Sequence, residues 1–125
     1  MKDKDIFKRV VDISPDVSNF LSDLDERAVK KALYVIQIIE DLQIVSEKIV
    51  KKVKSTNFYE LRIQVGNEYR IILFTIDHDN FMESSHVVLL HGFQKKEKKD
   101  YKKAIQKAEN ILQVYQEEQS ENEEE

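Results

Sequence analysis

The stretch YELRIQVGNEYRIILFTI, residues 59–76, has the clearest secondary-structure pattern in the chain. Polar and apolar side chains alternate from Glu60 to Val65, and this period of two indicates a β-strand with one buried face. Gly66-Asn67 is a turn signal, and the apolar and aromatic residues that follow, up to Ile76, are typical of a return strand. The stretch therefore predicts an antiparallel hairpin.

Two registers of this hairpin are possible, and they bring different side chains together. A two-residue turn at Gly66-Asn67 would send Arg62 and Arg70 to opposite faces of the sheet. A three-residue loop at residues 65–67, with a bulge, pairs Arg62 with Arg70 instead. This second register also gathers five apolar side chains on one face: Leu61, Ile63, Tyr69, Ile71 and Leu73. We predict the second register, because it separates core residues from polar ones.

The residues before the hairpin predict one strand and two helices. The strand is expected from Ile6 to Ile13. Ser14 is expected to cap a first helix that starts with Pro15 and runs to about Asp23. Asp25 is expected to cap a second helix, to which we assign no chemistry, with an apolar stripe of Val29, Ala32, Leu33, Ile36 and Ile39.

The residues after the hairpin predict a third strand of the meander, Val87 to Phe93, and a helix from Lys95 to about Glu118. The apolar stripe expected on this helix comprises Tyr101, Ile105, Ala108, Ile111, Leu112 and Tyr115. The predicted order is β-α-α-β-β-β-α, an α+β fold with a small, mostly antiparallel sheet and helices packed on one face. The other face is expected to remain open for a ligand.

Charge is unevenly distributed along the chain. The 125 residues carry a formal net charge of −4, but residues 117–125 hold six glutamates and no base, so the rest of the chain has −4 + 6 = +2. Residues 48–107 carry thirteen Lys or Arg against seven Asp or Glu, an excess of positive charge that suits a polyanion. We predict one domain over residues 1–116 and an acidic, disordered tail over 117–125.

Several classes of protein are excluded by what the chain lacks. It has no cysteine, so it offers no disulfide framework or thiolate metal site, and a cytoplasmic location is expected. Its charged N-terminus precedes no apolar run of the length that a signal peptide or membrane span needs. With only two glycines it has no phosphate-binding glycine loop, and we expect neither a metal nor a cofactor.

The predicted pairing of Arg62 with Arg70 is a candidate phosphate seat, because two opposed cations repel unless an anion lies between them. A surface ladder in which Glu60 and Glu68 neutralise the arginines is the alternative. Lys95 and the lysines after it come where the third strand passes into the helix, close enough to reach the same anion.

Cutting RNA requires a base for the 2′-hydroxyl, cations for the phosphate and an acid for the leaving 5′ oxygen. Five residues are candidates for these catalytic roles: Glu60, Arg62, Arg70, His91 and Lys95. Six more are candidates for RNA binding: Lys54, Phe93, Lys96, Lys98, Lys99 and Tyr101. His91 is expected to share a face with Val87, Leu89 and Phe93, where a purely structural role is the alternative, and Phe93 and Tyr101 are equally suited to the core.

Three short blocks resemble the RelE superfamily of toxins, especially its HigB-like, phage-derived branch: YELR at 59–62, EYRI at 68–71 and LLHGFQKK at 89–96. The resemblance covers roughly residues 48–115. It implies a RelE-like fold and the toxin of a type II toxin–antitoxin system, which cuts messenger RNA in the ribosome. In that reaction the RNA's own 2′-hydroxyl attacks the neighbouring phosphate without a metal.

The resemblance also implies roles for single residues. Arg62 and Arg70 match the strand cations that hold the scissile phosphate, Lys95 matches the basic residue after the last strand, and Tyr101 matches the aromatic of the terminal helix. The acid and base differ among branches, so the roles of Glu60 and His91 stay hypotheses. A cognate antitoxin is the implied partner. A ParE-like inhibitor of DNA gyrase and an inactive member that binds RNA or antitoxin are the alternatives.

Overall fold

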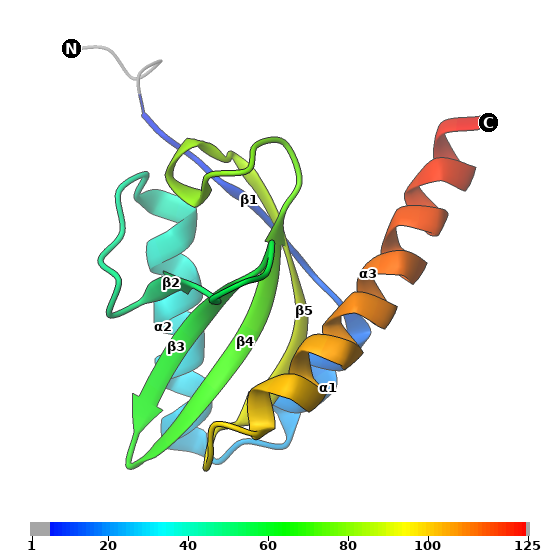
Figure 1. Ribbon diagram of the computed structural model, residues 1–125. Helices are drawn as coiled ribbons and strands as arrows, with labels where there is room; N and C mark the ends of the chain where they lie inside the picture. Colours follow the sequence, from blue (N-terminus) through cyan, green and yellow to red (C-terminus); the bar gives the residue numbers. More distant parts are fainter. Residues whose placement is uncertain (1–5, 125) are drawn as a thin grey trace.

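The computed structural model describes residues 6–124, which form one five-stranded sheet with three α-helices around it (Figure 1). The strands lie in the order β1-β5-β4-β3-β2; β1 is parallel to β5, and the other neighbours are antiparallel. The elements are β1 Val10–Ile13, α1 Pro15–Ser22, α2 Glu26–Asp41, β2 Val50–Lys52, β3 Tyr59–Val65, β4 Asn67–Thr75, the 3-10 turn η2 Phe81–Glu83, β5 His86–Gln94 and α3 Asp100–Glu124. This confirms the predicted α+β class.

The β3–β4 hairpin has the predicted three-residue register. Arg62 pairs with Arg70, and Val65 pairs with Asn67 across Gly66. Gly66 has a φ of 73°, a left-handed conformation that glycine adopts without steric cost. The five apolar side chains expected on one face are all buried in the same core: Leu61, Ile63, Tyr69, Ile71 and Leu73.

Both predicted helix starts are confirmed, while some predicted boundaries and faces are wrong. The Ser14 hydroxyl accepts the Val17 amide at 3.2 Å, and Asp25 accepts the Ala28 amide at 2.8 Å. The first strand begins only at Val10, and the three-residue β2 was not predicted. On α2, Leu33 is exposed, because the buried stripe is turned toward other positions: Ala28, Ala32, Val35, Ile36 and Ile39.

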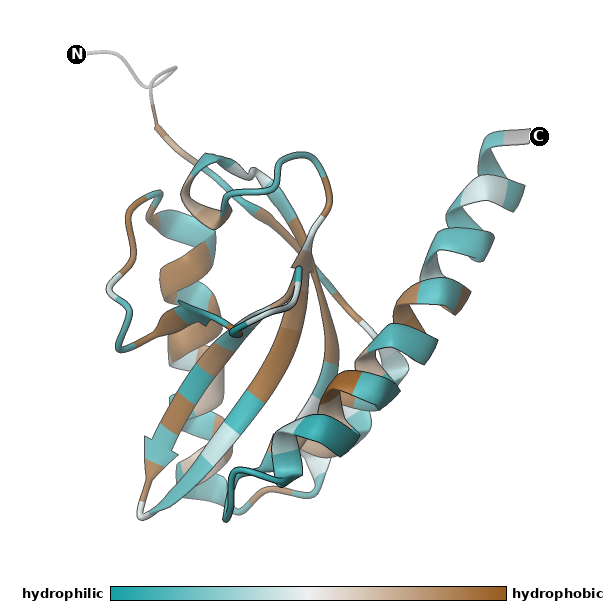
Figure 2. Ribbon diagram, viewed as in Figure 1, coloured by the Kyte–Doolittle hydropathy of each residue, from teal (hydrophilic) through white to brown (hydrophobic). Residues whose placement is uncertain are grey.

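Helices cover both faces of the sheet, whereas the sequence predicted them on one. A first core lies between the sheet and helices α1 and α2. A second core lies on the opposite face, where Ile72, Val88 and Leu90 pack against Ala104 and Ala108 of α3. The predicted stripe of α3 thus packs on the face that was expected to stay open. Figure 2 shows β4 apolar over most of its length and polar toward the hairpin.

Of the acidic residues 117–125, which the sequence predicted as a disordered tail, those up to Glu124 continue α3, and Glu125 lies outside the described residues. The helix runs to Glu124, and residues 116–123 are exposed all around. Its last turns project beyond the sheet (Figure 1). None of the described helices combines the length and the apolar composition that a membrane span requires.

Arg9, just before β1, is buried and joins three distant segments. Its guanidinium donates to the carbonyls of five residues, at 2.5–3.2 Å: Ile39, Leu42, Gln43, Phe81 and Ser84. It also stacks on the Phe81 ring at 4.0 Å from the centroid. Burial lowers the pKa of Arg9 to about 10, so it remains charged at neutral pH. The side chain thereby supplies donors to carbonyls at the end of α2 and to the Phe81 carbonyl of η2, which also accepts the amide of Ser84 at 3.1 Å.

Candidate active site

The strand register places the candidate site at the hairpin end of the sheet, on the face that α3 covers. Arg62, Arg70 and Phe93 are paired across β3, β4 and β5. Glu60 and His91 belong to the next row, with Ile72 between them. Side chains that are directly opposite in neighbouring strands share a face. Strand pairing alone therefore brings four of the five predicted catalytic residues onto one face: Glu60, Arg62, Arg70 and His91.

His91 reaches this face because β5 contains a bulge, and the face predicted for it was wrong. Leu73 pairs with Leu89, but Ile72 pairs with His91, so Leu90 is an extra residue. Val87 and Leu89 accordingly lie in the first core, on the other side of the sheet. His91 stacks on Phe93 with ring centroids 6.0 Å apart. The prediction that His91 and Phe93 share a face is therefore confirmed.

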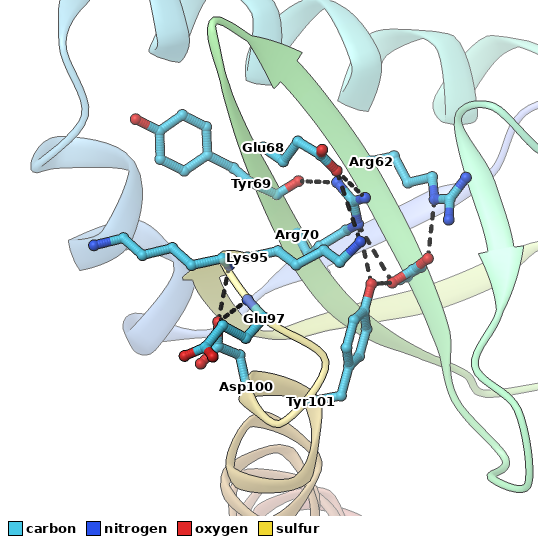
Figure 3. A network of polar contacts seen from close by, with 10 residues as sticks. Arg62, Glu68, Tyr69, Arg70, Lys95, Glu97, Asp100 and Tyr101 are labelled. Atoms are coloured by element: carbon cyan, nitrogen blue, oxygen red, sulfur yellow. Dashed lines mark hydrogen bonds and ion pairs between the residues drawn. The ribbon is translucent and has the colours of Figure 1, made fainter.

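Glu60 is the buried centre of the polar cluster, drawn in Figure 3. Its Oε2 accepts the Nε of Arg62 at 2.9 Å, and its Oε1 lies 3.5 Å from the Nε of Arg70. Oε1 also accepts the hydroxyl of Tyr101, which α3 brings over the strands. The carboxylate thus fixes both arginines and the tyrosine in one arrangement.

Arg70 is only 4% exposed, and its charge is balanced by hydrogen bonds and ion pairs with other side chains. Its Nε donates to the Tyr101 hydroxyl at 3.2 Å and its Nη2 to Glu68 at 2.7 Å. Burial by itself would lower the pKa of Arg70, but the hydrogen bonds to Tyr101 and Glu68 outweigh it and raise the pKa. The two carboxylates do neutralise the arginine pair, but around a buried cation and not as the surface ladder considered from the sequence.

Tyr101 and Glu68 have shifted pKa values that suit this arrangement. Burial, followed by the hydrogen bond to Glu60, raises the pKa of Tyr101, so the phenol keeps its proton and remains a donor. The hydrogen bond from Arg70, and then its charge and that of Lys95, lower the pKa of Glu68. Tyr101 also meets the edge of Phe93, with ring centroids 5.6 Å apart.

The turn between β5 and α3 presents the predicted lysines. Asp100 accepts the amides of Lys96 and Glu97 at 2.8 and 2.9 Å, which fixes the turn (Figure 3). The Nζ of Lys95 lies 3.9 Å from Glu68, within the cluster. Lys96, Lys98 and Lys99 are exposed on the same turn. Lys54 is also exposed, but it lies in the turn between β2 and β3 and not in the turn between β5 and α3.

Two hollows open beside the cluster. The larger, which we call the basic hollow, has a volume of about 660 Å³ and is lined by five cations from separate parts of the chain: Lys31, Lys48, Arg62, Arg70 and Lys95. The second hollow, about 520 Å³, lies along the start of α3 and is lined by His91, Phe93, Lys99, Lys103 and Lys107. Either can accept an extended polyanion.

Comparison with known proteins identifies the family. Residues 19–113 match the family described as phage-derived protein Gp49-like. The chain belongs to the Gp49-like family. Its fold is similar to that of the Escherichia coli toxin RelE, an arginine-to-alanine double mutant solved in the free state, with a TM-score of 0.58 and 12% identity over 80% of this chain and 97% of RelE. A search of curated proteins found no matching sequence.

The Gp49-like family and the RelE-like fold confirm the superfamily predicted from the sequence; the HigB-like branch stays a prediction. The structure adds residues to the site of this Gp49-like chain that the sequence did not suggest. Asp16, at the start of α1, lies 2.9 Å from the Nδ1 of His91. Lys31 and Tyr34 of α2 line the basic hollow. The available signal was Tyr34 itself, an aromatic residue outside the apolar stripe predicted for α2. Asp16 gave none, because 75 residues separate it from His91.

Proposed function

We propose that this chain is the toxin of a type II toxin–antitoxin system and cuts messenger RNA in the cytoplasm, on the translating ribosome. Its membership of the Gp49-like family and its RelE-like fold support a toxin of this superfamily. The observation that carries the proposal is the arginine pair Arg62 and Arg70, fixed by Glu60 and Tyr101 at the wall of the basic hollow. A cognate antitoxin would cover this basic surface.

Glu68 marks the place where a phosphate would bind. Its carboxylate, half-exposed, occupies the Nη2 of Arg70 and lies near Lys95. A phosphate oxygen has the same charge and accepts the same hydrogen bonds. When RNA enters, its phosphate would displace Glu68, and Arg62, whose side chain is 31% exposed, would complete the seat. Arg70 would then stabilise the charge that develops on the phosphate oxygens.

Proton transfer is assigned to Glu60 and His91. They lie in one row with a strand between them, about 10 Å apart at the backbone, since neighbouring strands are roughly 4.8 Å apart. A phosphate held over Arg70 would therefore lie between the two groups. Asp16 orients the ring of His91 through Nδ1, which leaves Nε2 as the atom that exchanges a proton.

The proposed reaction needs no group beyond these side chains. The 2′ oxygen forms a bond to phosphorus while the bond from phosphorus to the 5′ oxygen breaks. One proton leaves the 2′-hydroxyl and another reaches the 5′ oxygen. Glu60 and His91 take these two roles on opposite sides of the phosphate. Phe93, Tyr101 and the lysines of the turn, Lys96, Lys98 and Lys99, would hold the flanking RNA, and Lys54 would contact a more distant phosphate.

The experiment that tests this proposal is mapping of messenger 5′ ends after brief induction in cells. Wild type is expected to create new ends at preferred codons, and Arg62→Ala to create about a hundredfold fewer, because it removes one donor to the phosphate. Arg27→Ala removes an exposed arginine outside the site and serves as the matched control. Growth arrest with intact messenger and damaged DNA would instead establish the ParE-like alternative.

A further inference from the structure

The basic hollow extends beyond the catalytic cluster to helix α2, to which the sequence assigned no chemistry. We propose that Tyr34 is a stacking seat for an unpaired RNA base, with Lys31 and Lys48 holding the adjoining phosphates. This inference rests on the proposed function, since the strand that binds here is the one cut at Arg62 and Arg70. It adds a second binding subsite to that function, one that would hold the base beside the cut whatever its identity.

The shape of the sheet explains why the hollow reaches α2. β2 pairs with β3 only over Tyr59 to Leu61, and the amide of Arg62 still donates to the carbonyl of Ile49 at 2.8 Å. In the described sheet, no strand pairs with this edge of β3 from Ile63 onward. The hollow lies along this edge and continues to α2, where Lys31, Tyr34, Val35 and Ile38 line it. A strand of RNA seated at Arg62 thus has a path around the sheet edge. The volume of about 660 Å³ is within the roughly 300–1,000 Å³ usual for ligand sites.

Charge favours a polyanion in this hollow. Five cations line it, against a single carboxylate, that of Glu68. Lys31 and Lys48 come from α2 and from the segment before β2, far along the chain from the three cations of the cluster. Such convergence of separate basic residues on one concave surface raises the local concentration of a nucleic acid.

Tyr34 supplies the second feature that single-stranded RNA needs, an accessible aromatic ring. The residue is 61% exposed, and the Nζ of Lys31, one turn earlier, lies 5.8 Å from its ring centroid. Bases stack on exposed aromatic side chains beside cations in proteins that hold single strands. Val35, Ile38 and Ile49 form the apolar part of the same surface.

A protein partner is the competing occupant, because Leu33, Leu42 and Ile44 are also exposed. Leu33 is the neighbour of Tyr34 but does not line the hollow. Tyr34 can therefore be separated from the apolar surface by mutation. The cations on the walls of the hollow favour RNA over an apolar protein surface, since charged side chains are depleted at the centre of protein interfaces.

Binding of a short RNA tests the stacking seat. The probe is a fluorescent single-stranded hexanucleotide with 2′-O-methyl groups, which block cleavage. Tyr34→Ala is expected to weaken its binding about tenfold, the low-to-middle range for loss of one base stack. Tyr34→Phe, which keeps the ring, is expected to restore binding, and Leu33→Ala to bind as wild type.

The salt dependence of the same binding tests the lysines. Lys31→Ala is expected to reduce the slope of log affinity against log salt by about 0.7, the value for one phosphate contact on a single strand. Lys30→Ala, which changes an exposed neighbour outside the hollow, is the matched control and is expected to leave the slope unchanged.

The outcomes separate this inference from the proposed function. If Arg62→Ala abolishes cleavage but Tyr34→Ala binds the probe as tightly as wild type, the subsite is wrong and the cleavage site stands. Equal losses in Tyr34→Ala and Leu33→Ala would assign the surface to an apolar partner and also overturn the subsite. Wild type that fails to bind the probe would overturn it too, because an exposed ring and five cations should bind single strands without the ribosome.

Discussion

The chain buries two arginines, Arg9 and Arg70, and they have opposite surroundings. Arg9 is 2% exposed and donates to five backbone carbonyls. Arg70 is 4% exposed and binds mainly side chains, Glu60, Glu68 and Tyr101, at the wall of a hollow. Backbone carbonyls cannot leave, whereas a half-exposed carboxylate such as Glu68 can be replaced by a ligand. Burial alone therefore does not distinguish a structural cation from a functional one; the kind of acceptor does.

The largest effect is expected from Arg9→Met, which tests the structural half of the comparison. Methionine keeps much of the apolar stem but removes all five donated hydrogen bonds. Each buried carbonyl left without a donor costs about 1–3 kcal/mol, and partial relaxation reduces the sum to about 4 kcal/mol or more. Denaturant titration of the purified variant measures this loss. A free energy of unfolding within 1 kcal/mol of wild type, roughly the value of one hydrogen bond, would show that water replaces the guanidinium.

Arg70→Met is the matched substitution at the proposed catalytic site. We expect messenger cleavage to fall about a hundredfold or more, because a donor to the developing charge is lost. The free energy of unfolding should fall by less than for Arg9→Met, since Glu60 retains Arg62 and Tyr101 as partners. Cleavage assays and denaturant titrations on the same preparation compare the two losses. A variant that unfolds as easily as Arg9→Met but still cuts would reverse the assignment of the two arginines.

Asp77, whose negative charge acts on Arg9, predicts how the stability of the protein depends on pH. Hydrogen bonds from Ser84 and Ser85 lower the pKa of Asp77. A carboxyl whose folded pKa is depressed stabilises the protein above its unfolded pKa, near 3.9, and this contribution disappears as the pH falls through the folded value. Wild type should therefore lose more stability than Asp77→Asn between neutral pH and about pH 3. Melting curves across this range that run parallel for the two proteins would contradict the prediction.

The smallest effect, on RNA binding, is expected from a change at Glu68, whose carboxylate accepts a hydrogen bond from Arg70. Glu68→Gln removes the negative charge that competes with a phosphate, so RNA should bind a few times more tightly. Because the pKa of Glu68 is lowered, mainly by Arg70, wild type should keep this competition into mildly acidic solution. Titrating wild type and Glu68→Gln with the uncleavable RNA probe at neutral and mildly acidic pH measures the affinities that test both expectations. Weaker binding by Glu68→Gln would mean that Glu68 orders Arg70 and does not compete with the ligand.

The sequence predicted the parts of the molecule that depend on local pattern. Alternation between residues 60 and 65 was enough to select the hairpin register, which brings Arg62 and Arg70 together. Ser14 and Asp25 are caps that act within three residues. Each of these signals is contained in a short segment, so one sequence sufficed.

The features that the sequence did not predict depend on contacts between distant segments. The partners of Arg9 come from α2, the loop after it and the segment around η2. The bulge at Leu90, which turns His91 toward α3, has no local signal. α3 packs on the second face because Ile72, Val88 and Leu90 form an apolar surface there. The sequence pattern of β4 and β5 had been interpreted as that of strands with a single buried face. Strands covered on both sides instead carry apolar residues on both faces.

Cleavage of messenger RNA by the polar end of the sheet can be measured in a translating extract. The quantity to measure is the rate of messenger cleavage by purified wild type, Arg62→Ala and Arg27→Ala, with translation running and with translation blocked. We expect equal, translation-dependent cleavage by wild type and Arg27→Ala, and a rate at least about a hundredfold lower for Arg62→Ala. Intact messenger with folded wild type, or equal cleavage by Arg62→Ala, would contradict this expectation.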